Sequence, residues 1–233
     1  AKKGSQIIHF KEAFHGRSGY TLSLTNTSDP RKTMYFPKFD WPRIDNPKLS
    51  FPLSDHVLKE VKKKEELALE QIKQALYDNP DDIAGLVIEP IQGEGGDNHF
   101  RCRFFEQLRA LADENEFLLI YDEVQTGVGI TGKMWAHQHF TPSLCPCDKK
   151  IEKAPLPDIL SFGKKAQVCG LLAGKRVEEV DDHVFSESSR INSTWGGNLT
   201  DMVRFQIILE IIDKENLLDN ATKMGDFLLL ELQ

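Results

Sequence analysis

The sequence predicts an α/β protein in which a mostly parallel, mixed sheet is covered by helices on both faces. Short apolar runs alternate along the chain with segments whose apolar residues recur at helical spacing. At 233 residues the chain is long enough to bury a substantial core. Polar residues stand directly after the apolar runs, at the points where the strands of such a sheet would end.

The first part of the chain is predicted to contain one strand, one long loop and one long helix. Residues 7–10 form an apolar run typical of a buried strand. Residues 27–53 are rich in Pro, Asp, Asn and aromatic side chains, which predicts an irregular excursion. Ser54 is a suitable N-cap for a helix whose apolar face continues through residues 57–76.

The remainder of the chain alternates between the two kinds of element. Apolar runs predict buried strands, and helical spacing of apolar residues predicts amphipathic helices. The strands are expected at residues 83–91, 117–121 and 158–162, and the helices at residues 104–112, 199–212 and 217–232.

Composition excludes several classes of protein. A net charge of −7 leaves no basic surface for nucleic acid, and no apolar run approaches membrane-spanning length. The three lysines at residues 62–64 could form a basic recognition patch, but two glutamates follow them, so we interpret them as a solvated helix face. Four cysteines are too few for a disulfide scaffold, which favours a reducing, cytoplasmic location. Both ends look cut from a longer chain.

Two predicted strands end in groups that suit chemistry on a heteroaromatic cofactor. Asp122 follows one apolar run, and Lys164 and Lys165 follow another. A lysine amine can bind the aldehyde of pyridoxal phosphate, while a carboxylate keeps its pyridine nitrogen protonated. Such residues are also common as solvated groups at strand ends. Because Lys164 stands directly after a glycine, we expect it, rather than Lys165, to be the reactive amine.

Neighbouring residues strengthen this interpretation. Val124 could pack on an aromatic ring, and Gln125 could bind a cofactor hydroxyl. Phe14 and Arg17 offer a stacking ring and a guanidinium that suits a carboxylate, although core packing and a surface charge are their ordinary roles. The residues that follow Thr194 could bind phosphate before a helix, or could form an ordinary turn.

Other polar clusters have weaker functional interpretations. Glu89 and Glu94 lie in a Gly-rich loop after a strand. Paired acids can act in acid–base catalysis, but a lysine is already available for proton transfer, so an orienting or gating role is favoured for them. His137 and His139, with the cysteines at 145 and 147, could bind zinc. Their spacing matches no common zinc module, so we expect no metal.

The order of these segments resembles the class III, fold-type I aminotransferases that use pyridoxal phosphate. Three longer strings, at residues 13–27, 37–44 and 192–202, resemble the L-lysine 6-aminotransferases in particular. The resemblance implies a large cofactor-binding domain over residues 1–233 that acts on L-lysine and 2-oxoglutarate. The products would be 2-aminoadipate 6-semialdehyde and glutamate. It also implies a homodimer or a higher homo-oligomer.

The resemblance assigns roles to individual residues. Lys164 would hold the cofactor and move a proton, and Asp122 would pair with the pyridine nitrogen. The remaining assignments are Phe14 and Val124 on the two faces of the ring, Gln125 at its phenolic oxygen, Thr194 at the phosphate of the neighbouring subunit's cofactor, Arg17 at the α-carboxylate of lysine, Glu89 in support of Gln125, Glu94 as a switch between the two substrates, and Asn192 in the substrate pocket.

Two departures from the family pattern leave alternatives open. Residues 141–157 are longer than the family usually shows, which predicts a surface insertion. The family's N-terminal phosphate-binding turn and its C-terminal small domain are absent from the sequence. The alternatives are therefore another ω-aminotransferase, acting on 4-aminobutyrate or ornithine, or a non-catalytic piece that contributes only structure.

Overall fold

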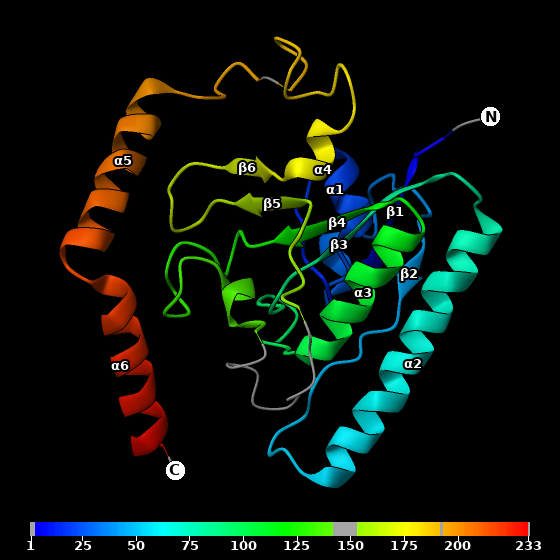
Figure 1. Cartoon of the computed structure of the whole chain (residues 1–233), viewed down its shortest axis with the longest axis horizontal. Helices are drawn as coiled ribbons and strands as arrows, with labels where there is room; N and C mark the ends of the chain where they lie inside the picture. Colours follow the sequence, from blue (N-terminus) through cyan, green and yellow to red (C-terminus); the bar gives the residue numbers. More distant parts are fainter. Residues whose placement is uncertain (1–2, 142–152, 192, 233) are drawn as a thin grey trace. The chain divides into compact units, whose positions relative to one another are not determined.

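The computed structural model describes residues 3–141, 153–191 and 193–232 (Figure 1). Its contacts divide the chain into two compact units. The first comprises residues 1–122 and 139–157, and the second comprises residues 123–138 and 158–233.

The first unit is built on parallel strands. These are β1 (Gln6–Phe10), β2 (Arg43–Ile44), β3 (Ile83–Ile88) and β4 (Leu118–Asp122). β1 pairs with β2 and with β3, and β3 also pairs with β4, with Leu86 opposite both Ile8 and Leu119. Because all three pairings are parallel, the carboxyl ends of β1, β3 and β4 lie at the same edge.

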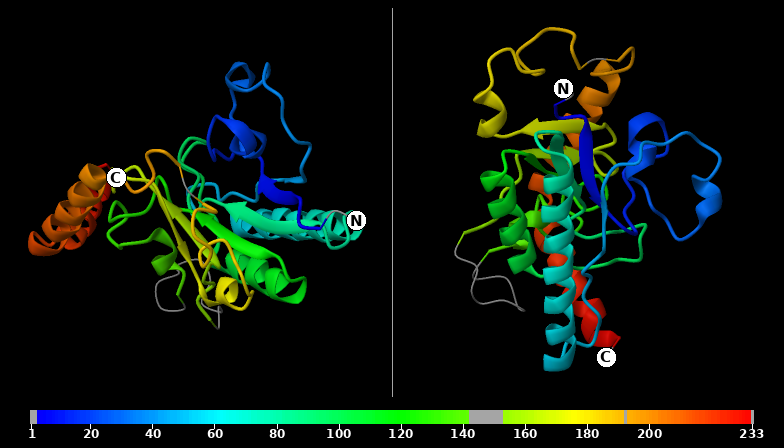
Figure 2. Two further views of the ribbon diagram at one scale, coloured as in Figure 1. Left: turned by 90° about the horizontal axis from the view of Figure 1, so that it is seen from above. Right: turned by 90° about the vertical axis from the view of Figure 1, so that its right-hand side faces the viewer.

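Helices of the first unit connect these strands. They are α1 (Gly19–Leu24), the short 3-10 turn Pro30–Lys32, α2 (Asp55–Asp78) and α3 (Cys102–Glu114). The predicted N-cap of α2 is confirmed, because the Ser54 hydroxyl accepts from the backbone N–H of Val57 at 3.2 Å. In both views of Figure 2 the excursion after β1, drawn in blue, lies away from α3.

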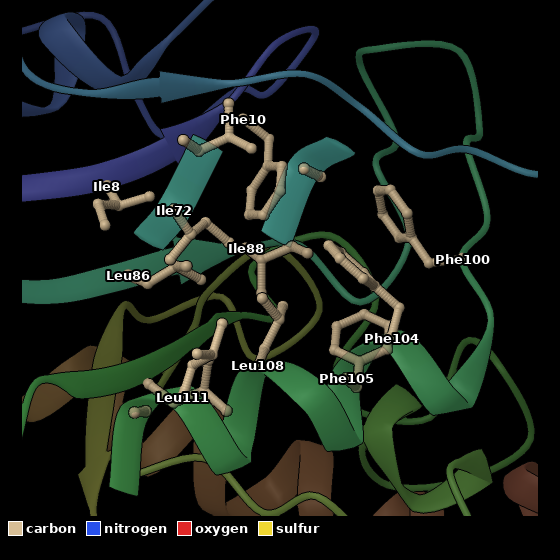
Figure 3. Close-up of a cluster of buried hydrophobic side chains, with 14 of the residues drawn as sticks. Ile8, Phe10, Ile72, Leu86, Ile88, Phe100, Phe104, Phe105, Leu108 and Leu111 are labelled. Carbon is tan, nitrogen blue, oxygen red and sulfur yellow. The ribbon is translucent and has the colours of Figure 1, made fainter. Parts of the chain in front are cut away.

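The core of the first unit lies between its strands and its two long helices (Figure 3). Alternate residues of β1 and β3 point into it, and α3 contributes a row of phenylalanines and leucines at helical spacing. Phe105 stacks on Phe140 with ring centroids 4.3 Å apart. The fully buried side chains include Ile8, Phe10, Ile72, Leu86, Phe104, Phe105 and Leu108.

His9 is fully buried on β1 and ties the excursion to the strands. Arg43 Nε donates to His9 Nε2 at 3.0 Å, and His9 Nδ1 lies 3.3 Å from the carbonyl oxygen of Ile7. A guanidinium can only donate, so Nε2 must accept and the proton sits on Nδ1. Burial lowers the pKa of His9 to about 4, which keeps the ring neutral at pH 7.

The second unit pairs its strands in the opposite sense. β5 (Ile159–Phe162) and β6 (Gly170–Ala173) are antiparallel, and the helices are α4 (Lys175–Glu178), α5 (Leu199–Lys214) and α6 (Leu217–Glu231). A 3-10 turn, Ala136–His139, spans the boundary between the units. A smaller core joins β5 to α5 and α6 through Leu160, Phe162 and Ile212. The prediction of a mixed, mostly parallel α/β protein is therefore confirmed.

Several expectations need adjustment. The strand predicted at residues 83–91 ends at Ile88, because Pro90 removes a backbone donor two residues later. Sequence patterns did not predict α1, β2, β6 or α4, which are too short for periodicity to be read. Cys169 is a free thiol but Cys102 is disulfide-bonded, so the sparse cysteines do not by themselves indicate a reducing compartment. A cytoplasmic location stays a prediction.

Two expectations concern features outside the folded core. None of the helices in the described part of the chain has the length and apolar character needed to cross a bilayer. The predicted surface insertion falls largely on residues 142–152, which lie outside the described residues.

A buried ion pair fixes α2 against the start of α3. Arg101, at the N-cap of α3, donates from Nε to Glu65 Oε1 at 2.9 Å and from a terminal nitrogen to Oε2 at 2.5 Å. The two side chains are 6% and 3% exposed. The forked geometry matches the guanidinium to the carboxylate, and it offsets the cost of burying both charges.

We predict that breaking this pair is far worse than removing it. Glu65→Met or Arg101→Met alone should lower the free energy of unfolding by about 3–5 kcal/mol, because one charge stays buried without its partner. The double variant should cost less than the sum of the two. Urea unfolding measures each value, with Glu60→Met, whose side chain is 46% exposed, as a control that leaves stability nearly unchanged. Additive losses would contradict the coupling.

Candidate active site

The carboxyl ends of β1, β3 and β4 gather polar groups at one edge of the first unit. Asp122 is the last residue of β4, and Glu89 directly follows β3. The loop after β1 carries Phe14, His15 and Arg17. Segments more than a hundred residues apart therefore meet at this edge, as expected for a parallel sheet.

Asp122 contacts a histidine that the sequence reasoning did not select. His15 Nδ1 lies 2.7 Å from Asp122 Oδ2, and the two side chains are only 3% and 11% exposed. The backbone N–H of His15 donates to the hydroxyl of Thr25 at 3.0 Å, and that hydroxyl donates to the carbonyl of Gly16 at 2.6 Å. The loop therefore holds the ring against Asp122. The only signal in the sequence was the position of His15 beside Phe14.

Glu89 bridges two loops of this edge. It is 4% exposed, and its Oε1 accepts from the backbone N–H of Phe14 at 2.9 Å. Its Oε2 accepts from the N–H of Gly93 at 3.3 Å. Burial raises the pKa of Glu89 to about 7, an effect that the charge of Asp122 reinforces and that His15 and the two backbone donors oppose. Glu89 thus changes its charge near neutral pH.

The Gly-rich loop after β3 is held in a defined shape. Gln92 and Asn98 exchange two backbone hydrogen bonds of 3.0 Å. A Cβ on Gly95 would lie 2.2 Å from the carbonyl oxygen of Glu12, so only glycine fits there. Glu94 projects from this loop and pairs with Lys32 of the excursion, with 2.6 Å between Nζ and Oε1. Both side chains are partly exposed, and Arg17 is exposed.

In the second unit a buried carboxylate shapes the segment that carries Val124 and Gln125. Glu123 is fully buried, and its two oxygens accept four hydrogen bonds. The donors are the N–H of His137 at 3.0 Å, Nδ1 of His137 at 2.8 Å, the N–H of Ala136 at 2.6 Å and the hydroxyl of Thr126 at 3.1 Å. Sequence reasoning missed Glu123, which lies directly beside the more obvious Asp122.

Lys164 lies beside both residues of that segment. Its N–H donates to the carbonyl of Val124 at 3.2 Å, and its amine donates to the side-chain oxygen of Gln125. Lys164 lines a cavity of about 560 Å³, within the size range of small-molecule sites. Lys165 does not line it. The other lining residues are Val124, Gly163, Gln167, Val168, Cys169, Ser193, Trp195, Gly196, Gly197 and Asp201.

The lining suits pyridoxal phosphate in its donor set. An amine, two valine side chains and a Gly-rich segment face the same space, as an aldehyde, an aromatic ring and a phosphate would require. Asp122 and Lys164 belong to different units. That both contact the same cofactor ring therefore stays a prediction. Thr194 is exposed and does not line the cavity, and Asn192 lies outside the described residues.

Two alternatives can be compared with the structure. The side chain of Asn198 accepts from the N–H groups of Thr200 at 3.0 Å and of Asp201 at 3.3 Å. This capping supports the ordinary helix start after Thr194. Over the residues that the structure describes, no group of three or more His, Cys, Asp and Glu side chains could hold a metal ion. His137 instead pairs with Glu123, and Cys145 and Cys147 lie outside the described residues.

We predict that Glu89 makes stability fall as pH rises. Its pKa is raised in the folded state, so the folded protein binds the proton more tightly than the unfolded chain between pH 4.5 and 7. The free energy of unfolding, relative to that of Glu89→Gln, should fall by about 2 kcal/mol from pH 5 to pH 8. Urea unfolding of both proteins at each pH measures this difference. A pH-independent difference would contradict the raised pKa.

Comparisons with known proteins identify the family of the chain. The family profile described as aminotransferase class-III matches residues 1–233. The chain is 53% identical over 225 residues to an L-lysine-epsilon aminotransferase of Mycobacterium tuberculosis, covering 97% of this chain and 46% of that protein. It is 37% identical to a 4-aminobutyrate aminotransferase of Dictyostelium discoideum, covering 95% of this chain and 41% of the other.

A solved structure extends the likeness to three dimensions. The lysine aminotransferase from M. tuberculosis in its internal aldimine form matches with a TM-score of 0.87 and 53% identity. The match covers 97% of this chain and 48% of that one. The chain therefore spans about half the length of the relatives it matches. It belongs to the class III aminotransferases, a family that uses pyridoxal phosphate.

Proposed function

We propose that this chain serves in an aminotransferase that moves the ε-amino group of L-lysine to 2-oxoglutarate. The products are 2-aminoadipate 6-semialdehyde and glutamate. The observation that carries the proposal is the amine of Lys164, which faces a cavity beside Val124 and Gln125. The 53% identity to L-lysine-epsilon aminotransferases supports the choice of lysine over 4-aminobutyrate, for which the relative is 37% identical.

Lys164 is the group that binds the cofactor and then moves a proton. When bound, pyridoxal phosphate supplies an electron-accepting ring joined to the substrate nitrogen. Displaced from the cofactor, the amine of Lys164 takes the proton from Cε of the substrate lysine. Its hydrogen bond to Gln125 holds the amine at the cavity wall.

Other residues position the ring and the substrate. Asp122 pairs with the pyridine nitrogen, and Phe14 and Val124 cover the two faces of the ring. Gln125 contacts the phenolic oxygen, with Glu89 in support. Glu89 itself bonds the backbone of Phe14, which supports a role in fixing the stacking residue.

The substrate residues are proposed on charge and position. Arg17 is exposed at the same edge as Asp122 and holds the α-carboxylate of lysine. Glu94 acts as the switch that lets one pocket accept both lysine and 2-oxoglutarate, and its partner in this structure is Lys32. Thr194 reaches the phosphate of a neighbouring subunit's cofactor, which requires a homodimer or a larger homo-oligomer.

Loss of the reactive amine tests the central assignment. With pyridoxal phosphate and borohydride, the wild-type protein should retain one reduced cofactor on the peptide that contains Lys164, as read by mass spectrometry. Lys164→Ala should retain none and lose activity by at least about 10³-fold. Lys165→Ala is the matched control and should label as the wild type does. Labelling of Lys164→Ala would refute the assignment, and no labelling of any protein would favour a non-catalytic piece.

The amino donor is tested by competition among three amines. The full-length protein, supplied with 2-oxoglutarate, should turn over L-lysine with a higher kcat/KM than ornithine or 4-aminobutyrate. Glutamate formation is a common readout for all three substrates. A preference for 4-aminobutyrate or ornithine would support the alternative ω-aminotransferase and refute the choice of lysine.

A further inference from the structure

The ion pair between Lys32 and Glu94 joins two loops that lie far apart in the sequence. Lys32 belongs to the excursion after β1, and Glu94 belongs to the Gly-rich loop after β3. The two residues are 62 positions apart, and 2.6 Å separates Nζ of Lys32 from Oε1 of Glu94. Their side chains are 39% and 44% exposed, so the pair adds little to stability. Its main effect is on where the Glu94 carboxylate lies.

The backbone that carries Glu94 is held in place by the turn around it. The carbonyl of Gly93 accepts a hydrogen bond from the N–H of Gly96 at 3.1 Å, which closes the turn. Gly95 approaches the carbonyl oxygen of Glu12 so closely that a Cβ would lie 2.2 Å from it. Because the backbone is fixed, rotation of the Glu94 side chain is the motion by which its carboxylate can change position.

The same loop is tied to the edge at which β1, β3 and β4 end. The N–H of Gly93 donates to Oε2 of Glu89 at 3.3 Å, and Oε1 of Glu89 accepts from the N–H of Phe14 at 2.9 Å. Glu94 is therefore the neighbour of a residue that is bonded to this edge, while its own carboxylate is paired with a lysine of the excursion.

The 3-10 turn Pro30–Lys32 gives Lys32 a defined position as well. Asp29 caps this turn, because its Oδ1 accepts from the N–H of Arg31 at 3.1 Å and its carbonyl accepts from the N–H of Lys32 at 3.2 Å. The guanidinium of Arg31 is bonded to both carboxylate oxygens of Asp29, at 2.9 and 3.0 Å. Of these two adjacent cations, Lys32 is therefore the one that pairs with Glu94.

The two proposed substrates make opposite demands beside the reacting carbon. Cε of lysine carries no carboxylate, whereas C2 of 2-oxoglutarate carries one. A glutamate side chain close to this carbon is compatible with lysine, but it repels 2-oxoglutarate. In the second half of the reaction the Glu94 carboxylate must therefore lie elsewhere, and a cation at that second position favours the move.

We propose that Lys32 is a specificity-determining residue that holds the Glu94 carboxylate out of the substrate pocket while 2-oxoglutarate is bound. The inference rests on the proposed function, in which Glu94 is the switch, and it adds the group that receives the carboxylate. An ion pair of this exposure favours the withdrawn position by about two- to fivefold. Lys32 therefore adjusts the balance between the two substrates, and the reaction of lysine does not depend on it.

The contact can be tested without cofactor or substrate. A carbodiimide joins an amine to a carboxylate where the two groups touch, so in the full-length protein it should form an amide between Lys32 and Glu94. Mass spectrometry of the cross-linked peptides detects this amide. The pair of Lys48 with Glu12, whose side chains are 38% and 37% exposed, is the matched control. Lys32→Met should lose the first cross-link and keep the second. A control cross-link without one between Lys32 and Glu94 would overturn the proposal.

The effect on specificity is tested by measuring the two half reactions separately in the full-length enzyme. Lys32→Met keeps the length of the side chain but removes its charge, so kcat/KM for 2-oxoglutarate should fall about two- to fivefold while the value for lysine does not fall. Lys32→Arg keeps a cation and should restore the wild-type ratio of the two values. Lys63→Met removes a charge from the exposed pair with Glu60 on α2, and as the control it should change neither value.

A double-mutant cycle separates this inference from the proposed function. Glu94→Gln removes the charge that has to move, so adding Lys32→Met to it should not change the ratio of the two kcat/KM values further. An unchanged ratio in Lys32→Met, or an equal change with and without Glu94→Gln, would refute the role of Lys32 alone. An unchanged ratio in Glu94→Gln would refute the switch, and the role of Lys32 with it. Failure of the wild-type enzyme to react with either substrate would refute the proposed function itself.

Discussion

The parallel pairing of β3 with β1 and β4 is the constraint on which the rest of the first unit depends. It places the carboxyl ends of three strands at one edge of the sheet. The residues that follow these strands therefore lie close together, however far apart they are in the sequence. Glu89, Asp122 and the loop from Phe14 to Arg17 are neighbours for this reason alone. The apolar core of α2, α3 and the strands holds that edge rigid.

Buried polar groups at this edge are arranged in pairs that compensate one another. The Asp122 carboxylate is hydrogen-bonded to the imidazole of His15, and the Glu89 carboxylate accepts hydrogen bonds from two backbone N–H groups. Elsewhere in the unit, Glu65 meets Arg101. Each carboxylate is desolvated and therefore needs a donor of fixed position. The same arrangement that makes burial tolerable also leaves one group, Glu89, with a pKa near neutrality.

In the second unit, one buried carboxylate organises the loop around it. Glu123 collects four donors from the segment between β4 and β5 and so determines the path of the chain past Val124 and Gln125. Lys164 then bonds to both of these residues. The amine of Lys164 is thus held by a neighbouring segment whose shape depends on the buried carboxylate of Glu123.

The sequence by itself determined the strands that end in Asp122 and before Lys164, the long helix capped by Ser54, and the family to which the chain belongs. These follow from apolar periodicity, local capping and short sequence motifs, all of which can be read from neighbouring residues. Only the tertiary structure decided that His15 faces Asp122, that Glu89 holds Phe14, and that Glu123 anchors its own loop. The physical reason is that hydrogen bonds between residues distant in the chain leave no periodic pattern in the amino-acid sequence. Their polar groups must pair only because the fold buries them away from water.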